Sequence, residues 1–174
     1  MSYNAVRARL TDYAVFKDGE QKLGMADVTL PDIEYLADSI KGPGIGGEVN
    51  MPTMSMVGAL PITINWRIIS EDLTELAAPK AHDLEFRGAQ QQYDSATGEM
   101  EIVPVVINVR ALPTKMALGK FEVGATTDSS SEMEAVYLKI TVDGQVRTEI
   151  DKFARVFTLN GTDYMADIRA ALGL

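Results

Sequence analysis

Alternation of apolar and polar residues runs through most of this chain and predicts strands more often than helices. The alternation is clearest over residues 62–66 (ITINW) and 136–142 (VYLKITV), where every second residue is apolar. This period of two is typical of a strand with one buried face. Asp143-Gly144 follows the second stretch and favours a tight hairpin turn. A returning strand and its continuation are therefore expected over residues 145–159.

Two further hairpins are predicted upstream. Residues 12–30 suggest two short strands with Asp18-Gly19 as the turn, and residues 82–113 suggest a long hairpin joined at 95–98. Within the second, both faces of Ile102–Val109 are apolar, so coverage on both sides is expected. Pro104 cannot donate to a strand ladder and indicates an edge or a bulge.

Helix signals are few. Ser70 is a good N-cap before an acidic first turn, and Pro79 marks the end of one short helix. A second helix is predicted over residues 162–172, with Thr162 as cap and Gly173 as its end. Met165, Ile168 and Leu172 form its apolar stripe.

Residues 1–174 are expected to form one domain, because no linker or internal repeat interrupts the pattern. The fold class predicted is mainly β, a sandwich or barrel-like sheet with one or two short helices. Residues 42–50 and 114–131 are predicted to be extended surface loops, since glycine, serine and threonine accumulate there.

Gly42, Gly44 and Gly47 match the spacing of a dinucleotide-binding turn. Such a turn must open a helix, whose N-terminus holds the pyrophosphate. Here Pro52 and strand-forming residues follow instead. The glycines are therefore interpreted as a connecting loop, and no cofactor is predicted.

Three methionines, Met51, Met54 and Met56, follow this loop. Methionine is used both at adaptable binding surfaces and as a filler of cores, and the sequence leaves both interpretations open. A glycine-rich excursion followed by methionines is suited to reaching a neighbouring subunit. The candidate subunit or ring contacts are Gly42, Gly44, Gly46, Gly47, Met51 and Met54.

The amino-acid composition excludes several kinds of functional site. The chain has no cysteine and one histidine, which excludes thiolate metal sites, disulfides and histidine-rich metal centres. A formal net charge of −9 argues against general nucleic-acid binding. That acidity suits either plain solubility or a surface past which nucleic acid moves without sticking.

No catalytic constellation is recognisable. His82 lies beside Asp83 without a nucleophile motif and is interpreted as a surface or rim residue. Asp94 and Glu99 flank a turn and are interpreted as solvated carboxylates. The prediction is that the protein is not an enzyme. A small acidic β-domain with carboxylate catalysis remains the remote alternative.

The N-terminus carries two arginines without a following apolar stretch, and the longest apolar runs are too short to span a bilayer. Neither a secretory signal nor a membrane anchor is expected, and the protein is therefore expected to start in the cytoplasm.

Three stretches resemble the major tail tube proteins of contractile-tailed bacteriophages and phage-tail-like bacteriocins. They are VTLP at residues 28–31 before the glycine cluster, the short helix followed by FRG at 86–88, and the block from Tyr137 to Leu174. The last contains an Asp-Gly turn, Glu-Ile-Asp, Asn-Gly and a final helix ending in Gly-Leu. Residues 1–12 depart from the pattern, being longer or more polar.

The resemblance implies a structural subunit without cofactor or metal. Six copies would close into a ring with a continuous inner β-barrel, and rings would stack into a tube. The implied partners are a sheath outside, a tape-measure protein inside during assembly and a baseplate initiator. DNA would pass through the lumen in a phage. The implied location is a virion tail or bacteriocin particle, and the tube of a type VI secretion-like apparatus is the alternative.

Overall fold

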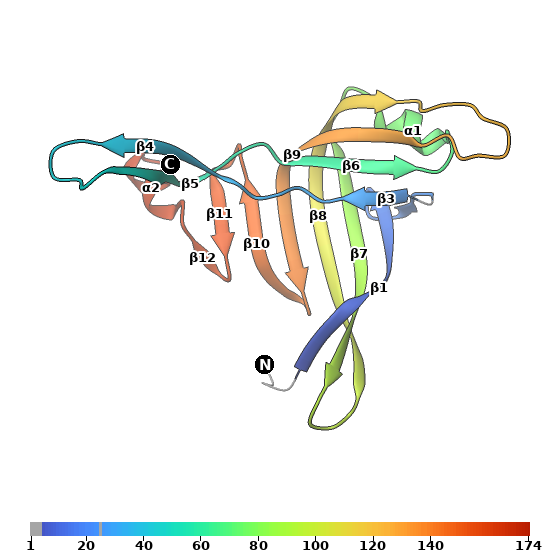
Figure 1. Ribbon diagram of the computed structural model, residues 1–174, viewed down its shortest axis with the longest axis horizontal. Coiled ribbons are helices and arrows are strands. Elements are labelled where there is room, and N and C mark those ends of the chain that lie inside the picture. Colours follow the sequence, from blue (N-terminus) through green and yellow to red (C-terminus); the bar gives the residue numbers. More distant parts are fainter. Residues whose placement is uncertain (1–4, 25) are drawn as a thin grey trace.

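The computed structural model describes residues 5–24 and 26–174, and strands dominate it (Figure 1). This confirms the mainly β class. The strands are β1 (Ala5–Lys17), β2 (Gln21–Lys22), β3 (Ala26–Thr29), β4 (Tyr35–Lys41), β5 (Glu48–Val57), β6 (Pro61–Trp66), β7 (His82–Asp94), β8 (Met100–Ala117), β9 (Ser129–Val142), β10 (Gln145–Asp151), β11 (Val156–Leu159) and β12 (Thr162–Asp163). The helices are α1 (Glu71–Leu76) and α2 (Ala166–Ala171).

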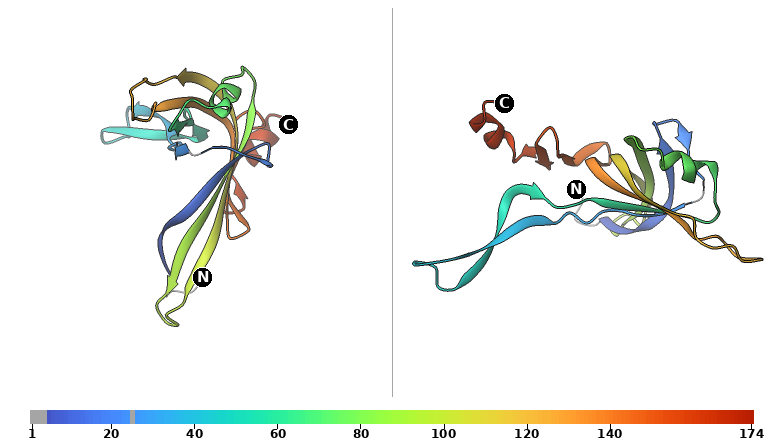
Figure 2. Two further views of the ribbon diagram at one scale, coloured as in Figure 1. Left: turned by 90° about the vertical axis from the view of Figure 1, so that its right-hand side faces the viewer. Right: turned by 90° about the horizontal axis from the view of Figure 1, so that it is seen from above.

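One large sheet carries the fold. Its order over the described residues is β12-β11-β10-β9-β8-β7-β1-β2, and neighbouring strands are antiparallel. The long strand β9 has two partners on its second edge. Residues 129–134 pair with β6, and residues 137–142 pair with β10. The sheet therefore divides along β9, and its upper part bends over, as Figure 2 shows from the side.

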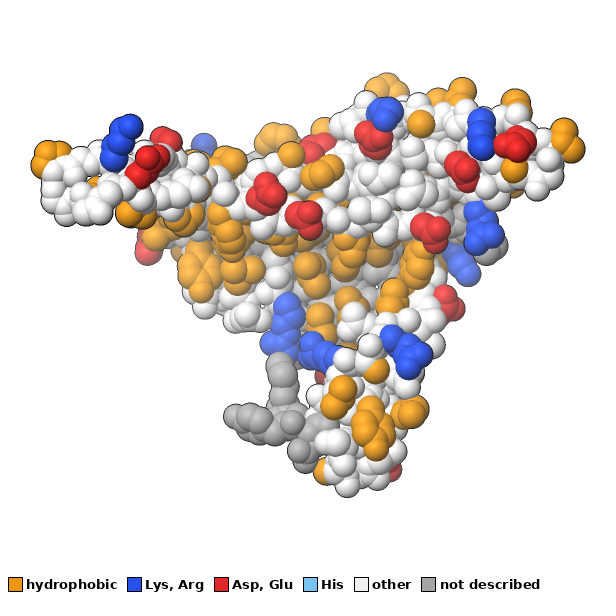
Figure 3. Space-filling model, viewed as in Figure 1, with side chains coloured by type: hydrophobic (Ala, Val, Ile, Leu, Met, Phe, Trp, Pro, Cys, Tyr) orange, Lys and Arg blue, Asp and Glu red, His pale blue; other side chains and the backbone are white. Residues whose placement is uncertain are grey.

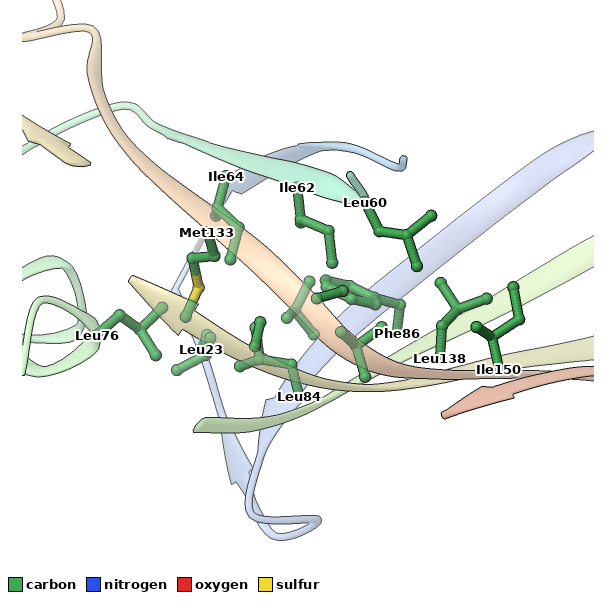
Figure 4. Close-up of a cluster of buried hydrophobic side chains, with 14 of the residues drawn as sticks. Leu23, Leu60, Ile62, Ile64, Leu76, Leu84, Phe86, Met133, Leu138 and Ile150 are labelled. Carbon is green, nitrogen blue, oxygen red and sulfur yellow. The ribbon is translucent and has the colours of Figure 1, made fainter. Parts of the chain in front are cut away.

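The core lies between β6 and the sheet of β7, β8 and β9 (Figure 4). Ile62, Ile64 and Trp66 of β6 are buried, which confirms the alternation predicted for this strand. Ile62 and Ile64 face Leu84 and Leu138 across the core. Burying side chains of this size stabilises the fold by roughly 1.5–3 kcal/mol each.

At one residue of β9, the set of alternating positions that faces the core changes. Ala135 pairs with Ala111 and Tyr137 with Arg110, so Val136 is the extra residue of a β-bulge. Ala135 and Leu138 are both buried although three positions apart. An inserted residue shifts the period of two, so the core-facing positions 131, 133 and 135 are followed by Leu138, with Ile140 packed against the core.

The β7–β8 hairpin has the predicted turn, and the coverage predicted for Ile102–Val109 fails at its Ile102 end. Val109 is buried, whereas Ile102 is 59% exposed because this end of the hairpin extends beyond β9. Pro104 pairs regularly with Ala89 on its β7 side and lies just beyond Val105–Val142, the last pair of β8 with β9, so the predicted edge position is confirmed. Its carbonyl accepts from the Asp143 N–H in the turn after β9, so the missing N–H interrupts no ladder.

One turn and two helix ends have the structure that the sequence predicts. Asp143 and Gly144 have φ of 52° and 69° and connect β9 to β10. The Ser70 side chain accepts from the Leu73 N–H at the start of α1, as predicted. At the end of α2, Leu174 N–H donates to the Arg169 carbonyl, a bond that Gly173 permits with φ of 72°.

Three predicted boundaries need correction. The predicted loop over 114–131 is strand at both ends, so the exposed connection is 118–128. The predicted helix over 162–172 begins only at Ala166, because Thr162 pairs in β12 with Leu159 instead of capping a helix. At the N-terminus, residues 5–12 form the first half of β1, and residues 1–4 lie outside the described residues.

Candidate subunit interface

The glycine cluster joins two strands that form a sheet of their own. β4 and β5 pair from Lys41 and Glu48 down to Ala37 and Pro52, and the turn between them spans residues 42–47. A strand follows the glycines, so the structure agrees with a connecting segment and not with a nucleotide-binding turn. The predicted loop over 42–50 is shorter than expected, since residues 48–50 belong to β5.

The hairpin formed by β4 and β5 has one apolar and one polar face. Directly paired residues share a face, so Ile40 and Val49 lie on the same side as Asp38 and Met51. The opposite side carries the pairs Lys41–Glu48 and Ser39–Asn50. All residues of β4 are exposed, and the hairpin projects from the body of the molecule (Figure 1).

The methionines after the glycines are exposed. Met54 is 65% exposed, and Met51 and Met56 are similar. Of the two interpretations left open by the sequence, packing in the core is therefore excluded for this subunit. Sequence reasoning missed Ile40 and Val49, although their alternation with polar residues marks an apolar face.

Aromatic contacts anchor the base of the hairpin. The Tyr35 ring meets the buried Phe157 edge-on, with centroids 5.9 Å apart, and Phe157 also contacts the Tyr164 ring. The Gly58 N–H donates to the Glu34 carbonyl at 2.9 Å. These contacts join residues that are far apart in sequence, so no local pattern could have predicted them.

His82 is 1% exposed, and its interpretation as a surface or rim residue is wrong. Its Nε2 lies 3.1 Å from the Ala78 carbonyl after α1, and Nδ1 is buried without a hydrogen-bond partner among the described residues. Asp83 is on the opposite face of β7, where Arg110 donates to it at 2.8 Å. Successive strand residues face opposite ways, so His82 and Asp83 cannot act as a pair.

Asp94 and Glu99 serve the turn of the β7–β8 hairpin. Asp94 Oδ1 accepts from the Ala96 N–H at 2.8 Å, and the Asp94 N–H donates to the Glu99 carbonyl. Over the described residues, no group of three or more metal-binding side chains was found. No helix among them is long and apolar enough to cross a membrane.

A second surface is the polar face of the large sheet. Cross-strand neighbours Asp83, Arg110, Tyr137 and Asp151 form one row over β7 to β10. Tyr137 donates to Glu149 at 2.9 Å, and burial, that hydrogen bond and the charge of Glu149 raise the pKa of Tyr137 to about 12.

The described residues form a β-rich protein with a projecting hairpin whose apolar face is exposed. Residues 7–173 match the family described as phage tail tube protein FII, and the chain therefore belongs to that family. It is 28% identical over 170 residues to the tail tube protein of Escherichia phage P2, with 92% of this chain and 94% of the relative covered.

Solved structures share the fold. The sheath/tube terminator of an extracellular contractile injection system, PVC, has a TM-score of 0.54 at 16% identity, covering 78% of this chain and 97% of that chain. The anti-feeding prophage tube-terminating cap has a TM-score of 0.50 at 17% identity, covering 79% and 92%. The family confirms the expectation of a tail tube subunit.

Proposed function

We propose that this chain is the repeating subunit of the inner tube, with six copies closing into a ring. The inner sheets of the six copies join into a continuous β-barrel, and the rings stack into a hollow conduit. The role is structural and not catalytic. One edge of β1 supports this arrangement. β2 pairs with residues 16–17 and the Leu23 N–H donates to the Val15 carbonyl, while residues 5–14 have no partner strand on that edge among the described residues. An open edge is normally covered or paired in the working assembly.

The observation that carries the proposal is the isolated hairpin of β4 and β5. A two-stranded hairpin is marginally stable in water by itself. This one exposes an apolar face containing Ile40, Val49 and Met51. We infer that the hairpin, with its tip at Gly42, Gly44, Gly46 and Gly47 and with Met54, contacts neighbouring copies. The connection over 118–128 is a second candidate contact, since Phe121 and Val123 are exposed there.

The assembly has further partners in this proposal. A sheath surrounds the tube, a tape-measure protein occupies it during assembly, and a baseplate initiator starts polymerisation in the bacterial cytoplasm. The acidic chain supports a lumen that lets DNA pass without binding it in a phage. A phage tail, a phage-tail-like bacteriocin and a type VI secretion-like tube share this architecture, and the neighbouring genes distinguish them.

Negative-stain electron microscopy of the purified protein at high concentration tests the proposal. Stacked six-fold rings of uniform diameter are the expected result. A species that sediments as a monomer at the same concentration, and still does so with a baseplate initiator added, would contradict it.

A further inference from the structure

We propose that the polar face of the large sheet lines the lumen of the tube, and that its arginines are kept from DNA phosphates by carboxylates of the same face. The inference rests on the proposed function, because only a closed ring gives the sheet a lumen side. It names the surface that DNA passes and the ion pairs that keep the DNA from binding there.

The polar face consists of two rows of cross-strand neighbours over β7, β8, β9 and β10, together with Arg87. Residues of one row are directly paired and therefore lie on one side of the sheet. The first row is Asp83, Arg110, Tyr137 and Asp151, and the second is Glu85, Asn108, Lys139 and Glu149. Arg87 follows on the same side of β7, so the face carries four carboxylates and three cations.

The other side of the same four strands belongs to the core. The residues that alternate with the two rows are all buried, and they are Leu84, Val109, Leu138 and Ile150. β6 and α1 contribute to the core on that side, and β6 lies in front of the sheet in Figure 1. Figure 3 has the same view and shows hydrophobic side chains gathered in a band below the upper rim. Apolar side chains are more stable against protein than against water, so this side suits the outside of the barrel and its protein contacts.

The size of the ring requires a water-filled interior. A barrel of about 16–18 strands already encloses an aqueous channel. Six copies that each contribute β7, β8, β9 and β10 exceed that number, so the barrel is hollow. If the side with β6 and α1 faced inward, six second layers would occupy this space. The polar face turned inward leaves the conduit open.

The arginines of the polar face are already engaged. Arg110 donates to both carboxylate oxygens of Asp83, at 2.8 and 3.2 Å. This two-point pairing occupies the guanidinium groups that would bind a phosphate in the same way. Arg87 binds Glu85, and its guanidinium lies 4.2 Å from the centroid of the Phe16 ring.

Neighbouring strands hold the remaining charges. Glu85 also accepts from the Asn108 side chain at 3.1 Å, which fixes the carboxylate that binds Arg87. Lys139 lies directly opposite Glu149 in the sheet. DNA binding requires cations that neutralise phosphates, and each cation of this face has a carboxylate as its partner or its cross-strand neighbour. The face is therefore wetted but does not retain DNA.

Chemical labelling tests which side faces the lumen, because the chain has no cysteine of its own. Lys139→Cys reports on the polar face, and Glu71→Cys reports on the exposed start of α1. In assembled tubes a small maleimide is expected to modify both variants. A maleimide on a gold particle wider than the lumen is expected to bind along Glu71→Cys tubes only. Thr141→Cys, on the same side of β9 as Lys139, replaces Lys139→Cys if that variant does not assemble.

Removal of the carboxylates tests the ion pairs. The combined variant Asp83→Asn with Glu85→Gln frees both arginines. Its tubes are expected to protect roughly tenfold more short double-stranded DNA from nuclease than wild-type tubes at about 50 mM salt, and to lose most of it at about 200 mM. Nuclease removes DNA bound outside the tube, so protected DNA is DNA in the lumen. Asp83→Asn alone gives the same test if the combined variant does not assemble.

A matched control changes the charge elsewhere. Asp32→Asn with Glu71→Gln removes the same number of carboxylates from exposed positions outside the polar face. Its tubes are expected to protect no more DNA than wild-type tubes. Equal protection by this control and by the combined variant would show that net charge, and not the ion pairs of the polar face, decides retention.

The outcomes separate the two proposals. Wild-type protein that forms no rings contradicts the proposed function. Wild-type tubes together with gold along Lys139→Cys tubes, or without gold on Glu71→Cys tubes, overturn the assignment of the faces. Wild-type tubes that protect as much DNA as the combined variant overturn the role of the ion pairs.

Discussion

Glu134 of β9 accepts a hydrogen bond at 2.7 Å from Nζ of Lys152, which follows β10. The same oxygen accepts from the Leu60 N–H at 2.9 Å, just before β6. One carboxylate therefore holds together the three segments that meet where the sheet divides along β9.

Removal of this carboxylate is expected to destabilise the fold. Glu134→Ala leaves the partly buried Leu60 N–H and the Lys152 ammonium without their acceptor, at a cost of about 1–3 kcal/mol. Urea unfolding followed by circular dichroism measures the loss. The control is Glu132→Ala, whose ion pair with Lys115 is exposed on both sides and contributes at most about 1 kcal/mol. Equal losses in both variants would contradict this role for Glu134.

Acid is expected to weaken the fold through the same group. Burial opposes ionisation of Glu134, but hydrogen bonds from Lys152 and the Leu60 N–H outweigh it and hold its pKa below the ordinary 4.5. A lowered folded-state pKa means that the stabilisation is complete above pH 4.5 and is lost as the pH falls through the folded-state value. Asp163 is expected to contribute to stability with the same pH dependence, because the hydrogen bond from Arg169 lowers its pKa.

Unfolding free energies measured from pH 7 down to pH 3 check this dependence. The wild type is expected to lose stability with a steeper slope than Glu134→Gln, because the amide does not titrate. Identical slopes in the two proteins would show that Glu134 does not contribute.

Alkaline pH is expected to destabilise the fold through ionisation of Tyr137. Its pKa is raised to about 12, so the stabilisation is complete below the ordinary value of 10 and is lost as the pH rises through about 12. Absorbance of tyrosinate against pH is expected to include a component that titrates at about pH 12. Tyr137→Phe should remove that late component, and its persistence in the variant would assign it to another residue.

Phe157 is expected to be the anchor of the projecting hairpin. It is buried between Tyr35 and Tyr164, so Phe157→Ala should cost about 3–5 kcal/mol. Amide exchange in residues 35–57 should also accelerate relative to the rest of the sheet. Phe153→Ala is the control, since Phe153 is 81% exposed and its loss should change stability by no more than about 0.5 kcal/mol.

Deletion of residues 42–50 is expected to leave a folded monomer that no longer polymerises. These residues are all exposed and none belongs to the buried core cluster. Circular dichroism and sedimentation test the first expectation, and microscopy at the concentration that assembles wild-type protein tests the second. Long tubes formed by the deletion variant would refute the contact role of this segment.

The local pattern of the sequence was sufficient for the strands, turns and one helix cap. Alternation at Ile62 and Ile64, the turn at Asp143-Gly144 and the cap at Ser70 depend on neighbours within a few residues, so they can be interpreted without the fold. The candidate glycines were placed correctly between two extended segments for the same reason.

Only the tertiary structure decided burial and partnership. His82 is buried because α1 packs near the start of β7, and Val136 is bulged because β8 and β9 must continue to pair beyond that point. The hairpin of β4 and β5 pairs with no other strand among the described residues, so its apolar face stays open. Each of these outcomes depends on contacts between distant segments, whereas the strand period and the turns depend on local chemistry that the sequence carries by itself.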